Sequence, residues 1–187
     1  MSSPIGSDFP SIAIHPERVL YRVHRTVNDP LYFASSGNGR FDLTDQPGTG
    51  TCYLSPSPTG AYLETLGRLR TLSEDDIEER SLSEIVPTTS LSLADLTDRQ
   101  VLGRYQITGD ISTGTNYGPS QALADQLYRA GLDGIYYTAR HDPAFQERSV
   151  AVFGTSTASK LFAISVGPIP TALVNEVAHN FGLIVLP

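Results

Sequence analysis

A few side chains have types and surroundings that could support chemistry on an anionic ligand. Arg40 follows Gly39 in a long, polar, glycine-rich loop, and close backbone approach there suits a phosphate-binding loop. Arg22 lies in an apolar segment, where a charged group needs a partner or a cleft. From the residues alone, exposed positions are the better interpretation for Arg40 and Glu64, and core packing for Tyr53. For Arg22, three positions stay open: in a cleft, in a structural salt bridge, or on a solvent-facing strand.

Other candidates are weaker. Three tyrosines are predicted to pack in the core, namely Tyr32, Tyr136 and Tyr137. Arg140 and His141 are predicted to form an exposed loop pair, and nothing selects His24 as a general base. The four histidines and one cysteine show no metal-ligand spacing, so no metal is expected.

The candidate residues can form one site only if helices and strands bring them close together. Ser57 followed by Pro58 predicts a helix start, which places Glu64 on a helix. Segments 19–23 and 51–54 are predicted strands that carry Arg22 and Tyr53. Further strands are predicted at 91–96, 101–107, 135–138, 150–153, 161–166 and 183–186. Helices are predicted at 120–129 and 171–180, and 73–83 as a solvated connection or helix. This irregular order of strands and helices favours an α+β fold.

Bulk properties limit the function classes. The 187 residues, 40% of them hydrophobic, suffice for one domain with a sizeable core. The formal net charge of −7 argues against broad nucleic-acid binding, which needs a basic surface, but arginines in a cleft can still bind an anion. The single cysteine excludes an internal disulfide. With no secretory signal and no span-length apolar run, a soluble cytoplasmic protein without membrane contact is expected.

Three segments carry a resemblance when taken together. They are Gly39-Arg40-Phe41-Asp42; Cys52-Tyr53-Leu54-Ser55 with Ala61-Tyr62-Leu63-Glu64; and 131–137 (GLDGIYY) with 140–142 (RHD) and 150–153 (VAVF). In this order and spacing they resemble the RES domain family, the NAD⁺-degrading toxins of RES–Xre toxin–antitoxin systems. The resemblance covers roughly residues 19–186. It divides the chain into a flexible N-terminal arm, 1–18, and a single RES-like domain, 19–187.

The resemblance implies a fold, an activity and partners. The fold would be ADP-ribosyltransferase-like, with two small mixed or antiparallel sheets forming a cleft flanked by helices. The chain would cleave NAD⁺ at the nicotinamide–ribose bond, as a glycohydrolase or phosphorylase, with NAD⁺ as substrate and no cofactor. A cognate antitoxin is the expected partner, and a homodimer is possible.

Residue roles follow from the same resemblance. Glu64 would stabilise the positive charge that develops on the ribose. Arg40 and Arg22 would hold the pyrophosphate through charge-assisted hydrogen bonds. Tyr53 would contact nicotinamide or ribose. Glu64, Arg40 and Tyr53 are therefore the predicted catalytic residues, and Arg22, Arg40 and Tyr53 the predicted substrate-binding residues.

The chain departs from the family pattern at one position. Ala139 stands where the family has a serine, and Thr138 cannot replace it because neighbouring strand residues point to opposite faces. Ser149 offers another hydroxyl, at a position where the family serine is not expected. Two alternatives therefore stay open: an ADP-ribosyltransferase that modifies a macromolecule, and a catalytically weak RES-like module that binds a nucleotide or a partner.

Overall fold

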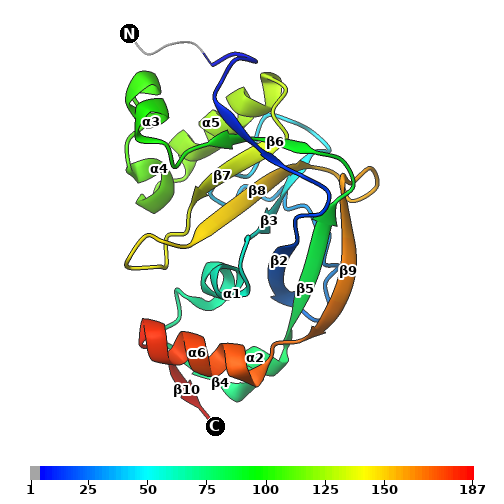
Figure 1. The fold of residues 1–187 in the computed structure, drawn as a ribbon, viewed down its shortest axis with the longest axis vertical. Helices are drawn as coiled ribbons and strands as arrows, with labels where there is room; N and C mark the ends of the chain where they lie inside the picture. Colours follow the sequence, from blue (N-terminus) through cyan, green and yellow to red (C-terminus); the bar gives the residue numbers. More distant parts are fainter. Residues whose placement is uncertain (1–4) are drawn as a thin grey trace.

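The computed structural model describes residues 5–187, which form ten strands in three sheets and six helices (Figure 1). In chain order the elements are β1 (Ser11–Ile14), β2 (Leu20–Arg25), β3 (Gly50–Leu54), α1 (Pro58–Leu66), β4 (Thr71–Ser73), α2 (Glu74–Glu78), β5 (Arg80–Pro87), β6 (Leu91–Asp95), α3 (Arg99–Tyr105), α4 (Asp110–Thr113), α5 (Gly118–Arg129), β7 (Gly134–Thr138), β8 (Arg148–Gly154), β9 (Leu161–Pro168), α6 (Thr171–Phe181) and β10 (Ile184–Leu186).

The largest sheet has five strands in the order β1-β6-β7-β8-β3. Its pairs are antiparallel except β6–β7, so the sheet is mixed. Every residue of β8 from Ser149 to Phe153 is buried, because hydrophobic clusters cover both faces of the sheet. Phe153 belongs to the cluster under α3 and α5, and Val152 to the cluster on the opposite side. The sheet is therefore a rigid platform for the residues at its rim.

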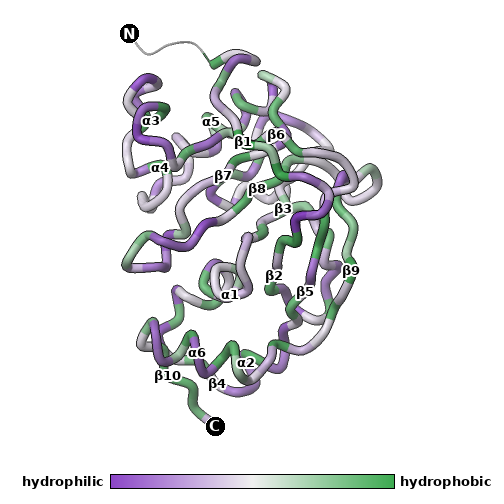
Figure 2. The backbone as a smooth tube through the Cα atoms, in the orientation of Figure 1, coloured by the Kyte–Doolittle hydropathy of each residue, from purple (hydrophilic) through white to green (hydrophobic). Residues whose placement is uncertain are grey.

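A second, antiparallel sheet has the order β2-β5-β9, and β10 pairs in parallel with β4 in a third sheet of two strands. Burial alternates along β5, as expected for a sheet with one covered face. The expected α+β class and the expected pair of small sheets are confirmed; the β4–β10 pair is an addition. Figure 2 shows hydrophobic and hydrophilic residues interspersed along α6, whose Leu173, Val174 and Val177 are buried.

Helix α1 lies between the large sheet and the layer formed by α6 and α2 (Figure 1). The side chain of Ser57 caps it by accepting a hydrogen bond from the backbone N–H of Gly60, and Pro58 occupies its first turn, as predicted. Its buried residues Tyr62, Leu63 and Leu66 pack in one cluster with residues of α6. This packing fixes the rotation of α1 about its axis and hence the direction in which Glu64 points.

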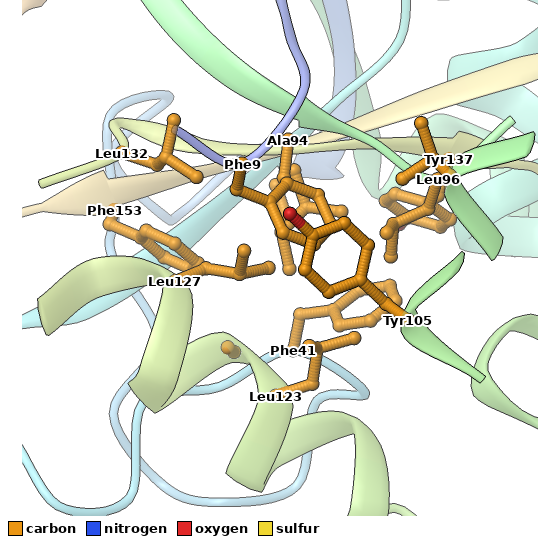
Figure 3. Close-up of a cluster of buried hydrophobic side chains, with 14 of the residues drawn as sticks. Phe9, Phe41, Ala94, Leu96, Tyr105, Leu123, Leu127, Leu132, Tyr137 and Phe153 are labelled. Carbon is orange, nitrogen blue, oxygen red and sulfur yellow. The ribbon is translucent and has the colours of Figure 1, made fainter. Parts of the chain in front are cut away.

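The N-terminal segment corrects one prediction. Residues 1–18 were expected to be a flexible arm, of which the structure describes residues 5–18. Within these, β1 is an edge strand of the large sheet, paired with β6, and Phe9 is only 2% exposed. Figure 3 shows Phe9 inside a cluster of buried side chains, beside Tyr105. The proline and glycine content of the segment concealed a short strand that is stabilised by tertiary contacts, namely its pairing with β6 and the burial of Ile14.

One further element prediction was wrong, and another was right only in part. Residues 101–107 were expected to be a strand, but α3 covers most of them: the Asp98 side chain caps its start and the left-handed Gln106 ends it. Residues 73–83 divide between α2, which begins with a capping box at Ser73, and the start of β5. The other predicted strands and helices are present, and Gly131 has a positive φ after α5.

Candidate active site

A cleft of about 330 Å³ opens between the two larger sheets and beside α1. Its walls come from β2, the 38–40 loop, β3, α1, the segment before α5 and the segment after β7. It brings together all four residues that the sequence predicted for the site, although they are spread over residues 22–64. The lining residues are Arg22, Val23, Asn38, Gly39, Arg40, Tyr53, Glu64, Thr65, Arg68, Tyr117, Arg140 and His141.

Glu64 is the only carboxylate among the residues that line this cleft. Tyr137 donates a hydrogen bond to its Oε1 over 3.0 Å, and Ser149 donates one to its Oε2 over 2.9 Å. Burial raises the pKa of the Glu64 carboxyl, while these two hydroxyls and the guanidinium groups of Arg40 and Arg140 oppose that rise. Glu64 is therefore a partly buried carboxylate in an environment that tunes its charge, unlike an exposed helix glutamate.

Arg40 is 8% exposed and lies across the cleft wall. Its Nη1 donates to the backbone oxygen of Ile111 over 3.1 Å, and its guanidinium carbon lies 4.7 Å from the centre of the Tyr117 ring. Its Nη2 is buried without a hydrogen-bond partner among the described residues. Burial lowers the pKa of this guanidinium, which still stays charged at neutral pH. A buried, charged donor without a partner is costly unless a ligand supplies the acceptor.

Backbone and side-chain hydrogen bonds hold the loop that carries Arg40. Tyr53 Oη donates to Asp42 Oδ1 over 2.8 Å and accepts from the backbone N–H of Phe41 over 2.9 Å. The other Asp42 oxygen accepts from the backbone N–H of Gly39. A Cβ at Gly39 would clash with Asp42 Oδ1 and Tyr53 Oη, so a larger residue would displace these hydrogen-bonded side chains. The Tyr53 hydroxyl thus holds the loop, and Tyr53 also lines the cleft.

Arg22 both bonds neighbouring protein groups and lines the cleft. One guanidinium nitrogen, Nη1, donates to the backbone oxygens of Pro30 and Tyr32 and contacts Cys52 Sγ at 3.2 Å. The side chain nevertheless lines the cleft. Arg22 therefore anchors the 30–32 segment against β3 while presenting positive charge to the same cavity.

Arg140 and His141 were expected to be an exposed loop pair, and this was wrong. Both are half-buried and line the cleft, since the chain turns inward after β7. Burial, and then the charge of Arg140, lowers the pKa of His141, which favours a neutral imidazole. With Arg22, Arg40, Arg68 and Arg140, four guanidinium groups face one carboxylate in a chain of net charge −7. The cleft is suited to an anionic ligand.

Ser149, Tyr117 and Arg68 are further residues that sequence reasoning missed. Ser149 was noted only as a hydroxyl at an unexpected position, and nothing in the sequence pairs it with Glu64, 85 residues away. Tyr117 lies in a segment without hydrophobic periodicity. Only its residue type, an aromatic side chain, could have marked it as a candidate for the site. Tyr137 is buried, as predicted, but its hydroxyl also serves the carboxylate.

The remaining candidates lie outside the cleft lining. His24 bonds Ser83 Oγ and the Arg25 backbone oxygen, and burial lowers its pKa. Tyr32 and Tyr136 are likewise absent from the lining. Among residues 5–187 no cluster of three histidine, cysteine or acidic side chains could hold a metal ion. Over the same residues, every helix is too short or too polar to cross a bilayer.

The fold and the cleft together define an α+β domain in which four arginines and one partly buried carboxylate line a single cleft. The chain belongs to the RES domain family, whose model matches residues 19–171. Its fold is similar to that of a chain in the crystal structure of the M. tuberculosis MbcT–MbcA toxin–antitoxin complex. The TM-score is 0.70 and the sequence identity 18%, over 89% of this chain and 92% of that chain. No curated protein matches the chain in sequence.

Proposed function

We propose that this protein cleaves NAD⁺ at the nicotinamide–ribose bond and acts as the toxin of a toxin–antitoxin pair. One observation carries the catalytic part: a single partly buried carboxylate, Glu64, faces a cleft lined by four arginines. NAD⁺ needs this combination, because its pyrophosphate is anionic while its reacting sugar becomes cationic in the transition state.

To cleave this bond, the enzyme mainly has to position NAD⁺ and stabilise the positive charge that develops on the ribose. As the bond between ribose C1′ and the pyridinium nitrogen breaks, its electron pair goes to nitrogen and nicotinamide leaves neutral. No general acid is needed, because the leaving group already carries the positive charge. The oxocarbenium-like ribose that remains is stabilised by the negative charge of ionised Glu64. A water or phosphate oxygen then bonds to C1′, and with water the extra proton is released.

The arginines would bind the rest of the dinucleotide. Arg40 supplies a buried Nη2 that has no acceptor among residues 5–187, and a pyrophosphate oxygen would satisfy it. Arg140, Arg68 and Arg22 add positive charge around the same cavity. The Tyr53 and Tyr117 rings offer apolar faces for nicotinamide or ribose.

The toxin role rests on relatives. The sequence motifs resemble those of the NAD⁺-degrading RES toxins, the RES domain model matches the chain, and a chain of the MbcT–MbcA toxin–antitoxin complex has a similar fold. We therefore expect a cognate antitoxin partner here too. Induced expression of the chain alone should arrest growth and deplete cellular NAD⁺, whereas the Glu64→Gln variant should do neither.

The direct test is a time course of purified protein with NAD⁺, with and without phosphate, following nicotinamide and the ADP-ribose product by chromatography. We expect nicotinamide release that Glu64→Gln reduces by at least about 10²-fold, since that change removes the charge and keeps the shape. Glu176→Gln is the matched control, because it removes an exposed helix carboxylate on α6.

The products separate the possible outcomes. Free ADP-ribose identifies water as the acceptor, and its 1-phosphate identifies phosphate. Nicotinamide release with ADP-ribose attached to a macromolecule in a cell extract would instead make the protein a transferase. Intact NAD⁺ at high protein concentration, in buffer and in extract, would contradict the proposal and leave a binding module.

A further inference from the structure

Each oxygen of the Glu64 carboxylate accepts a hydrogen bond from a different buried hydroxyl. Tyr137 Oη lies 3.0 Å from Oε1 and Ser149 Oγ lies 2.9 Å from Oε2. The two hydroxyl residues are 1% and 0% exposed, and neither lines the cleft. Their hydroxyls therefore contact Glu64 rather than a ligand in the cleft.

The two hydroxyls belong to one structural unit. Tyr137 and Ser149 are directly opposite each other in the antiparallel pair β7–β8, so their side chains lie on the same face of the sheet. Both strands are internal, with β6 on one side of the pair and β3 on the other. Two flanking ladders therefore fix the backbone under both donors, and the pair cannot shift independently of the sheet.

The helix that carries Glu64 is also held in place. Helix α1 is capped at Ser57, and the Ser57 hydroxyl also bonds Glu147, two residues before Ser149 on the chain. The Tyr137 ring packs edge-on against Phe41 with ring centres 4.8 Å apart, directly beside Arg40. One cross-strand pair thus connects the carboxylate helix to the arginine loop.

We propose that Ser149 and Tyr137 are positioning residues that clamp the Glu64 carboxylate, one hydroxyl on each oxygen, and keep it ionised and aimed into the cleft. Two donors on a carboxylate favour the charged form and oppose the effect of burial. They also fix the plane of the carboxylate, which leaves its remaining lone pairs for the ligand. Ala139, which is also buried, has no hydroxyl to add to this pair of donors.

The consequence for catalysis rests on the proposed NAD⁺ cleavage, but the clamp itself can be measured without activity. The carboxyl carbons of ¹³C-labelled glutamates are followed by NMR as the pH changes, and the Glu64 signal is assigned by its loss in Glu64→Gln. Ser149→Ala and Tyr137→Phe each remove one donor and keep the rest of the side chain. We expect the pKa of Glu64 to rise in each variant, and to rise further in the double variant.

Activity gives the second measurement. If ionised Glu64 is required, the acid limb of the kcat/KM profile should move to higher pH together with the NMR titration. The loss of kcat/KM should then be largest at low pH and small at high pH. Ser149→Cys, which keeps the shape but donates weakly, should give an intermediate shift. Ser83→Ala is the control, because it removes a buried serine that bonds His24 outside the cleft.

The two proposals fail in different ways. Shifted Glu64 titrations in a protein that never cleaves NAD⁺ would support the clamp and contradict the proposed function. An unchanged Glu64 titration in folded Ser149→Ala and Tyr137→Phe proteins would overturn the clamp. So would a kcat/KM loss of the same factor at every pH, because that is what a purely structural role produces.

Discussion

At the scale of single residues, Glu64 and Arg40 hold charges under conditions that do not favour them. Burial raises the pKa of the Glu64 carboxyl and lowers that of the Arg40 guanidinium. Arg40 also keeps a buried nitrogen without a partner in the described part of the chain. Such arrangements reduce stability and persist where a ligand uses them. We therefore expect the site to trade stability for function.

The Glu64→Gln variant tests whether the charge of Glu64 lowers the stability of the fold. A carboxyl whose pKa is raised by folding binds its proton more tightly in the folded state than in the unfolded chain. Its contribution to stability is therefore complete below the unfolded pKa and is lost as the pH rises through the folded pKa. Glutamine has no charge to desolvate, and the Ser149 hydroxyl can turn to accept from its amide. Glu64→Gln should thus raise the free energy of unfolding at neutral pH and change it less under acid conditions.

Urea denaturation of both proteins at about pH 4.5 and about pH 7.5 measures the effect, because a changed midpoint at constant slope reports stability. Glu176→Gln, on an exposed face of α6, should change neither midpoint appreciably. A Glu64→Gln protein that is less stable than the wild type at neutral pH would show that the hydrogen bonds of the carboxylate outweigh its burial.

At the scale of elements, the short edge strand β1 and the residues before it contribute to the core. Phe9 packs against Tyr105 of α3 with ring centres 4.5 Å apart, in the same cluster as Ala94 of β6 (Figure 3). This cluster also supports Phe41, which precedes Asp42 in the loop that presents Arg40. The N-terminal segment therefore helps to stabilise the site from a distance.

Phe9→Ala should destabilise the fold by about 3–5 kcal/mol, the usual cost of emptying a buried phenylalanine site. Thermal or urea unfolding measures this. Val27→Ala, at a residue that is 89% exposed, is the control and should change stability by less than about 0.5 kcal/mol. Wild-type stability in Phe9→Ala would restore the interpretation of residues 1–18 as a flexible arm.

At the scale of the whole molecule, charge is segregated. The chain carries a net charge of −7, yet four arginines and one glutamate line the cleft. The acidic residues lie elsewhere, for example along α2, where Glu74, Asp75 and Asp76 form the first turn. The acidic surface disfavours nucleic acid, and the arginine-lined cleft attracts a small anion locally.

Binding of NAD⁺ should consequently weaken with ionic strength. We expect the KM for NAD⁺ to rise several-fold between about 0.05 M and about 0.5 M NaCl, because salt screens the partly exposed arginines of the cleft. Arg68→Gln should raise the KM and flatten this dependence. Arg99→Gln is the matched control: it changes the net charge equally, but Arg99 is an exposed residue of α3 outside the cleft lining. Equal effects of the two substitutions would attribute the dependence to net charge alone.

The sequence by itself determined what depends on near neighbours. Ser57 and Pro58 define the start of α1 because a cap acts within three residues, and the strands that carry Arg22 and Tyr53 follow from local patterns. The RES-like motifs follow from residue order, and they led to Glu64 and Arg40, both of which line the cleft. Even Gly39 could be connected to a close approach, although not to its partner Tyr53.

Only the tertiary structure decided which distant residues meet. Ser149 reaches Glu64 because β7 and β8 pair in one register and α1 packs across them, and no spacing in the chain encodes a contact over 85 residues. Arg140 lines the cleft because the chain turns inward after β7, and β1 depends on its pairing with β6 and on the burial of Ile14. Hydrogen bonds between neighbours in sequence can be predicted from local patterns, whereas cross-strand pairs and helix packing depend on the arrangement of the whole chain.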